Sequence, residues 1–213
     1  MPSFSNIALR STIGFAISIA ALSAHGGIDF TPTVSDYTAE AVKFQRLIFR
    51  DDKERIEYEV PQGWTFDGSA AALRLKPATK NFAEAVVQAV PLSKAQLLDE
   101  NTRTALKEKA LADLPPGSQL AKIEQETESP LLLSGQPTFE LIISYQLMGE
   151  KFFRSALFAN RSNTEWSFRF TAKKADFVPL QNEFRRSVLS WHWLAAKGVS
   201  AQAASAATST LAH

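Results

Sequence analysis

Residues 135–193 read GQPTFELIISYQLMGEKFFRSALFANRSNTEWSFRFTAKKADFVPLQNEFRRSVLSWHW, and this stretch decides the fold. Every second residue over positions 139–147 is apolar, which is the pattern of a strand with one buried face. Gly149 and Glu150 predict a tight hairpin turn, and residues 151–159 follow as a central strand with bulky side chains on both faces. A third strand carries three aromatic residues on one face: Trp166, Phe168 and Phe170.

The stretch ends in one amphipathic helix. Its apolar residues recur at helical spacing, and charged residues occupy the other faces. These apolar residues are Phe177, Leu180, Phe184, Val188 and Trp191. We expect the helix to end at Trp191-His192-Trp193. Consecutive hairpins followed by a helix indicate the α+β class, with an antiparallel sheet whose apolar faces are covered by helices.

Segments before residue 135 extend this pattern. Alternating apolar residues and turn signals predict strands over 42–50, 55–60, 71–76, 83–90 and 118–128. Ser93 is the predicted N-cap of a helix that reaches Leu114, with a break near residues 99–102 as the alternative. Its apolar side would hold Leu97, Leu98, Ala105 and Leu111. Residues 129–137 are predicted to form a loop.

Composition restricts the classes of function. The chain has 213 residues, of which 45% are hydrophobic and 21% charged, and this suits one soluble domain with tails. The formal net charge of +1 argues against a nucleic-acid partner, which would call for a concentrated basic surface. The chain contains no cysteine, so disulfides, thiolate nucleophiles and a lipoprotein anchor are excluded.

Both ends of the chain differ from its middle. Residues 1–24 read as a secretory signal peptide, because Arg10 precedes an apolar stretch over 13–22 and small residues follow it. The alternatives are a retained membrane anchor and an organellar targeting peptide. Residues 25–41 are expected to form a linker, 42–194 the folded domain, and 195–213 a disordered tail rich in Ala and Ser.

The middle of the chain resembles the PsbP-like superfamily. This superfamily includes the PsbP proteins of photosystem II, the Ran-binding Mog protein and the bacterial DcrB-like envelope proteins, which are the most similar in character. The resemblance rests on Tyr58, Pro61 and Trp64, on Gly135 followed by Phe139, and on the spaced apolar residues of the closing helix. It implies an α/β/α sandwich with a central antiparallel sheet of about six to seven strands, a protein-binding role and no catalysis.

Three glutamates form the first candidate site. Glu124, Glu126 and Glu128 alternate along a predicted strand, so they would share one face and could bind a hard cation such as calcium. We favour the alternative, a solvated edge-strand face that resists aggregation through its like charges. No metal ion or cofactor is therefore expected.

The tryptophans form the second candidate. Trp64 and Trp193 are the best candidates for a recognition surface, since aromatic side chains are enriched at interfaces. Trp193 is expected to be the most exposed, because it lies beyond the apolar stripe of the last helix. Arg154 and Arg169 alternate with phenylalanines as in sheets that stack bases, but we interpret the aromatics as core and the arginines as the opposite face.

The sequence contains no nucleophile, metal-protease or phosphate-loop motif. We therefore expect an exported, non-enzymatic binding or assembly module of the bacterial envelope, periplasmic or extracellular, whose partner is another envelope protein. It would associate with a membrane only if the leader is retained. The alternatives are a small-ligand-binding protein or atypical enzyme with a pocket between sheet and helix, a photosynthetic lumenal subunit, and a secretion chaperone.

Overall fold

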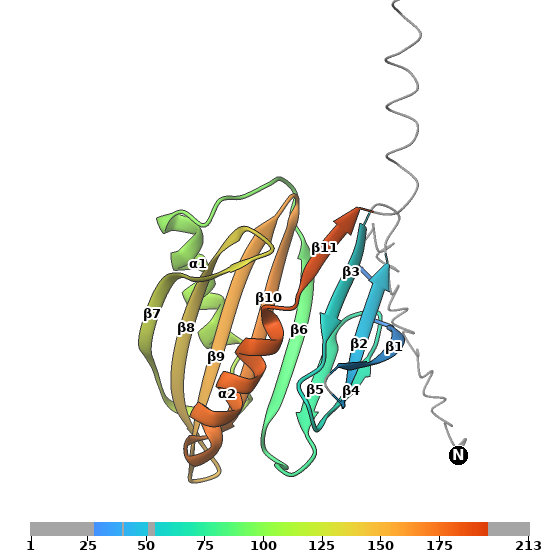
Figure 1. Ribbon diagram of the computed structural model, residues 1–213. Helices are drawn as coiled ribbons and strands as arrows, with labels where there is room; N and C mark the ends of the chain where they lie inside the picture. Colours follow the sequence, from blue (N-terminus) through green and yellow to red (C-terminus); the bar gives the residue numbers. More distant parts are fainter. Residues whose placement is uncertain (1–27, 40, 51–53, 196–213) are drawn as a thin grey trace, which may run out of the picture.

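Eleven strands and two helices make up the part of the chain that the computed structural model describes, residues 28–39, 41–50 and 54–195 (Figure 1). The strands are β1 (Thr33–Ala39), β2 (Val42–Arg50), β3 (Glu54–Glu59), β4 (Trp64–Gly68), β5 (Leu73–Pro77), β6 (Glu84–Pro91), β7 (Gln119–Leu133), β8 (Gln136–Leu147), β9 (Glu150–Arg161), β10 (Thr164–Lys173) and β11 (His192–Ala195). The helices are α1 (Glu100–Ala112) and α2 (Lys174–Val188).

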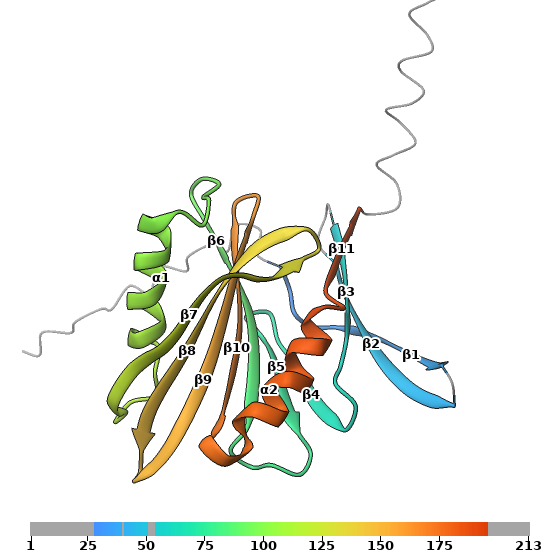
Figure 2. The same ribbon diagram turned by 60° about the vertical axis from the view of Figure 1, so that its left-hand side comes forward.

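These strands form two antiparallel sheets. The larger has seven strands in the order β4-β5-β6-β10-β9-β8-β7, and the smaller has four in the order β1-β2-β3-β11. Helix α1 packs on one face of the seven-stranded sheet, and α2 lies with the smaller sheet on the other face (Figure 2). The predicted antiparallel α+β fold with about seven strands in its main sheet is therefore confirmed.

The observed architecture differs from the predicted α/β/α sandwich in one respect. The four-stranded sheet shares one face of the seven-stranded sheet with α2, so α2 covers only part of that face. The sequence could not show this, because β11 joins β3 from the other end of the domain and such long-range pairing leaves no local pattern.

An aromatic cluster joins the two sheets. Trp191 is fully buried at its centre, with ring centroids 5.1–6.4 Å from those of five aromatic neighbours. The neighbours are Phe49, Tyr58, Trp166, Phe168 and Trp193. The Tyr58 hydroxyl also lies 2.7 Å from the Ser187 hydroxyl, and burial raises the pKa of this tyrosine well above its ordinary value. The smaller sheet is thus fixed to α2 and β10 by one continuous core.

Part of the expected linker belongs to the fold. Residues 33–39, which fall within the predicted 25–41 linker, form β1 and pair with β2. Phe30 is 1% exposed and packs edge-on against Phe49 and Trp166. The sequence of the edge strand β1 shows no regular alternation of apolar residues. The strand is held by backbone pairing with β2, which does not require such a pattern. The predicted signal peptide, the turn at residues 51–53 and residues 196–213 of the tail lie outside the described residues.

Gly68 lies against the segment that carries Phe30. A Cβ atom at this position would lie 2.2 Å from the Phe30 carbonyl oxygen and 2.7 Å from Cδ of Pro32. We expect Gly68→Ala to lower the free energy of unfolding by about 1–3 kcal/mol, because backbone atoms must move to admit the methyl group. Urea unfolding measures this loss. Gly63→Ala is not a suitable control because its φ is positive, so the control is Ala70→Ser on the adjacent exposed turn, which should leave stability unchanged.

Helix α1 begins later than predicted. Asp99, not Ser93, is its N-cap, and the Asp99 Oδ1 atom accepts a hydrogen bond from the Thr102 backbone N–H at 2.8 Å. The residues predicted for its apolar side are also wrong, because Leu106 and Ala110 are the buried ones. The helix thus begins at the break that was the alternative interpretation.

The end of α2 was also predicted wrongly. This helix stops at Val188, and His192–Ala195 form β11 instead of a last helical turn. The apolar residue Trp191 still falls in helical register with the stripe of α2, which is why periodicity alone extended the helix.

Strand β7 is longer than predicted and irregular. It continues to Leu133, so most of the expected loop 129–137 is strand, closed by a turn at Ser134 and Gly135. Its register with β8 shifts at three places, and Leu120 and Ser129 have positive φ angles at two of them. Such bulges on an edge strand interrupt the row of free backbone groups that another strand could pair with.

Candidate functional site

The three glutamates of β7 do not share a face, so this prediction was wrong. A bulge between Ile123 and Gln125 turns Glu124 to the α2 side of the sheet, where its carboxylate accepts a hydrogen bond from Ser144 at 2.7 Å. Glu126 and Glu128 point to the α1 side and pair with the helix. The Lys122 ammonium and the Ser144 hydroxyl both lower the pKa of Glu124.

No cation site results from this arrangement. Within residues 28–39, 41–50 and 54–195, no group of three acidic or histidine side chains gathers where a metal ion could bind. Glu126 accepts from Lys107 at 3.0 Å, and Glu128 lies 2.7 Å from Arg103. The two carboxylates therefore attach the edge strand to α1.

The two tryptophans predicted for a recognition surface are buried. Trp64 is 5% exposed, its indole N–H donates to the Glu183 carboxylate at 3.0 Å, and its ring packs on Phe184. Trp193 is 8% exposed, which contradicts the expectation that it would be the most accessible, because β11 directs its ring into the core beside Trp166. The two side chains therefore belong to the core.

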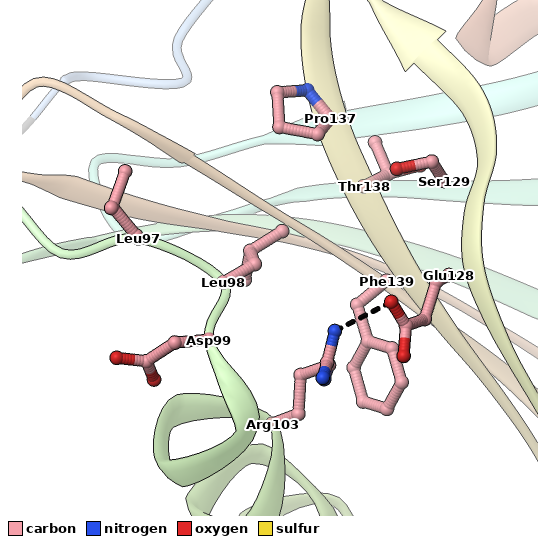
Figure 3. A pocket seen from close by; sticks show the side chains of 9 residues that line it. All are labelled: Leu97, Leu98, Asp99, Arg103, Glu128, Ser129, Pro137, Thr138 and Phe139. Carbon is pink, nitrogen blue, oxygen red and sulfur yellow. Dashed lines mark ion pairs between the residues drawn. The ribbon is translucent and has the colours of Figure 1, made fainter.

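A groove beside the start of α1 is the better candidate site. It has a volume of about 340 Å³ and lies between the loop that leads into α1 and the paired strands β7 and β8 (Figure 3). Its lining consists of Leu97, Leu98, Asp99, Arg103, Glu128, Ser129, Pro137, Thr138 and Phe139. We call this hollow the α1 groove.

The apolar part of the α1 groove combines buried and exposed side chains. Phe139 is 2% exposed, and Leu98 packs against the same small core. Leu97 is 83% exposed and lies in the loop, three residues before the first residue of the helix. An apolar side chain from another molecule could bury area against Leu97, Leu98 and Pro137, which is the main source of binding free energy at interfaces.

Four of the polar side chains that line the α1 groove are already engaged. The Arg103 guanidinium spans the groove to Glu128, and Figure 3 shows this ion pair beside the Phe139 ring. Asp99 caps the helix, and the hydrogen bonds from Thr102 lower the pKa of its carboxyl. The Thr138 hydroxyl donates to the Leu131 carbonyl at 2.6 Å. What the α1 groove offers a ligand is therefore apolar surface with a charged rim.

A second hollow of about 380 Å³ lies on the opposite side of the sheet, against α2. It is lined by Pro130, Leu131, Asn182, Arg185, Arg186 and Leu189. Next to it the Glu140 carboxylate is 7% exposed, lies 3.2 Å from Arg185, and accepts hydrogen bonds from Ser155 and Gln181. This satisfied ion pair holds α2 on β8 and β9, so we assign it a structural role.

No protein-family model matches the chain, and no curated protein matches it in sequence. Solved structures with a similar fold do exist. A cyanobacterial PsbP from Synechocystis is 14% identical, with 81% of this chain and 99% of that chain covered and a TM-score of 0.49. LpqN of Mycobacterium tuberculosis, described as involved in cell envelope biogenesis, is 15% identical, with coverage of 76% and 91% and a TM-score of 0.47.

A Pseudomonas aeruginosa protein of unknown function is 16% identical, with coverage of 73% and 94% and a TM-score of 0.41. A PsbP protein is thus among the similar structures, as the resemblance in the sequence suggests. Among the described residues, no helix is both long and apolar enough to cross a membrane.

The α1 groove was not predicted from the sequence, because Leu97 and Leu98 were assigned to the helix that follows. The signal that could have located it is Asp99, followed by Glu100 in the first turn and Thr102 at the third position. If Asp99 is the N-cap, Leu97 and Leu98 lie in the loop before the helix. Helical periodicity then does not explain these two adjacent leucines, and they become candidates for an apolar surface.

Proposed function

We propose that this chain is an exported binding domain that holds an apolar segment of another envelope protein in the α1 groove. The observation that supports this proposal most is Leu97, a large apolar side chain that is 83% exposed at the mouth of a hollow with an apolar floor. Such a side chain gains free energy when a partner covers it. The predicted signal peptide supports export.

The charges around the α1 groove define the partner further. Asp99, Glu100 and Glu128 contribute three negative charges near the groove, and Arg103 contributes one positive charge. The partner segment we propose therefore carries a leucine-like side chain next to a lysine or arginine. We propose no catalytic role, because Asp99, Arg103, Glu128 and Thr138 already form hydrogen bonds or ion pairs within the protein.

Site-specific photocrosslinking in the native host tests this proposal. A photoreactive residue at position 97 should give a crosslink to one envelope protein, identified by mass spectrometry. The matched control is position 148, where Met148 is 94% exposed at a distant hairpin. Equal crosslinks from both positions, or none from position 97, would contradict the proposal. Sequencing the N-terminus of the protein from the same cells tests export, with an expected start near Ala24 or His25.

We expect Leu97→Glu to weaken binding of the crosslinked partner about 10- to 100-fold, because it removes one buried apolar contact of about 1.5–3 kcal/mol. The free energy of unfolding should change by less than about 0.5 kcal/mol, since the side chain is exposed in the free protein. Titration calorimetry with a peptide of the crosslinked segment measures the affinity. Met148→Glu, which adds the same charge elsewhere, should bind like the parent protein.

A further inference from the structure

Helix α1 covers only part of its face of the seven-stranded sheet. Its buried residues contact side chains of β8 and β9, among them Ile143 and Ala156. Arg154 lies opposite Ile143, and Arg169 lies opposite Ala156 in the adjacent strand. Cross-strand partners project to the same face of a sheet, so both arginines lie on the α1 side, next to the helix end.

These two arginines belong to a patch of charges that we call the arginine patch. It consists of Arg74, Lys76, Arg154 and Arg169 with the carboxylates of Glu84 and Asp113. Arg74 and Lys76 share Glu84, and Arg154 and Arg169 share Asp113. Four cations thus form ion pairs with only two carboxylates. Counting Asp67 too, which lies opposite Arg74 on β4, the patch keeps one positive charge in excess.

The two central guanidinium groups have lost most of their water. The side chains of Arg154 and Arg169 are 11% and 19% exposed, and burial lowers the pKa of each. Arg154 donates to the Thr171 hydroxyl at 3.0 Å and to the Asp113 carbonyl at 2.8 Å. Within the described part of the chain, the Nε–H of Arg169 has no hydrogen-bond partner although it is buried. A buried cationic donor of this kind is costly unless an acceptor reaches it.

Asp113 is the carboxylate that pairs with both central guanidinium groups. It is the C-cap of α1, its side chain is 45% exposed, and its Oδ2 atom contacts both guanidinium groups. Rotation of this side chain into solvent would leave the two guanidinium groups without a carboxylate in direct contact, with only the more distant charge of Glu84 and the Gln88 amide oxygen, which accepts from Arg169, beside them. A phosphate group carries close to two negative charges at neutral pH and accepts bidentate hydrogen bonds from arginine, so it matches that pair in charge and geometry.

We propose that the arginine patch is a binding site for a phosphate group, with Arg154 and Arg169 as its ligands and Asp113 as an internal competitor. The phosphate could belong to a small molecule in solution or to a lipid headgroup. This site is separate from the α1 groove and does not depend on its function.

Phosphate titration of the purified protein tests the proposal by two-dimensional NMR at constant ionic strength. Inorganic phosphate should shift the signals of Arg169 and its strand neighbours. Asp113→Asn should bind phosphate about fivefold more tightly, because a partly exposed ion pair of up to about 1 kcal/mol no longer competes. Arg169→Gln should bind at least about tenfold more weakly. The control is Lys122→Gln, which removes one exposed positive charge on β7 and should not change the affinity.

Two outcomes would overturn the proposal. The first is that phosphate causes no shift in the parent protein or in Asp113→Asn, which would leave the arginines as a cap for the end of α1. The second is that Lys122→Gln weakens binding as much as Arg169→Gln, which would show attraction by net charge alone. Flotation with phosphatidylcholine vesicles containing phosphatidic acid then separates the sources. Flotation that requires Arg169 indicates a lipid headgroup, and phosphate binding without flotation indicates a soluble ligand.

Discussion

Replacing Trp191 with alanine is expected to lower the free energy of unfolding by about 3–5 kcal/mol, the largest effect of any substitution considered. Its ring contacts five aromatic side chains drawn from β2, β3, β10 and β11. The loss of the ring would leave a cavity between the two sheets, and neighbours on rigid strands can close such a cavity only in part. Urea unfolding followed by far-UV circular dichroism measures the change without relying on tryptophan fluorescence.

Trp191→Phe shows which property of the side chain matters. The indole N–H of Trp191 is buried and has no hydrogen-bond partner in the described part of the chain. Phenylalanine therefore removes volume but no hydrogen bond, and we expect a loss of only about 1–2 kcal/mol. A loss as large as that of the alanine variant would contradict this explanation. If Trp191→Ala does not fold at all, the phenylalanine variant still gives the measurement.

The second large effect concerns the ion pair between Glu140 and Arg185. Loss of Arg185 is expected to lower the free energy of unfolding more than loss of Glu140. Arg185→Met should lower the free energy of unfolding by about 3 kcal/mol, because it leaves a carboxylate that is 7% exposed without a counter-ion. Glu140→Gln should cost about 1 kcal/mol, since glutamine can still accept from Ser155 and the remaining guanidinium is 37% exposed to water.

Arg186→Met provides the matched control for this comparison. Arg186 is the next residue on α2, is exposed, and forms no ion pair within the described residues. Its replacement should change the free energy of unfolding by less than about 0.5 kcal/mol. The same unfolding experiment on the double variant Glu140→Gln, Arg185→Met completes a cycle. Equal losses for the two single variants would mean that burial of Glu140 does not decide the energetics of the pair.

Elements whose apolar residues recur regularly along one face were predicted correctly from the sequence. The alternation over residues 139–147 and the turn at Gly149 appear in the structure as β8 and its hairpin to β9. The helical stripe from Phe177 to Val188 is the buried side of α2. In each case one face of the element packs against the core, so its apolar residues recur in the sequence with the period of a strand or of a helix.

The remaining elements depend on partners that are distant in the chain. Strand β1 is polar and pairs at an edge, and β11 has only four residues, so neither shows a period of its own. The bulge in β7 separates Glu124 from Glu126 and Glu128, and no local signal in the sequence reports such a shift of register. The same holds for the arginine patch, where residues of β5, β9, β10 and the end of α1 meet only after folding.

The smaller sheet is built from both ends of the domain, and this has a consequence for timing. β11 adds to β3 as its last strand, and the Tyr58–Ser187 hydrogen bond spans 129 residues. The hydrogen bond cannot form before residue 187 is synthesised, and the pairing of β3 with β11 cannot form before residues 192–195 are, whereas β1, β2 and β3 can pair with one another earlier. The smaller sheet can therefore be completed only when the C-terminal end of the domain is available, and contacts of this sequence separation form slowly because the loop that they close is long.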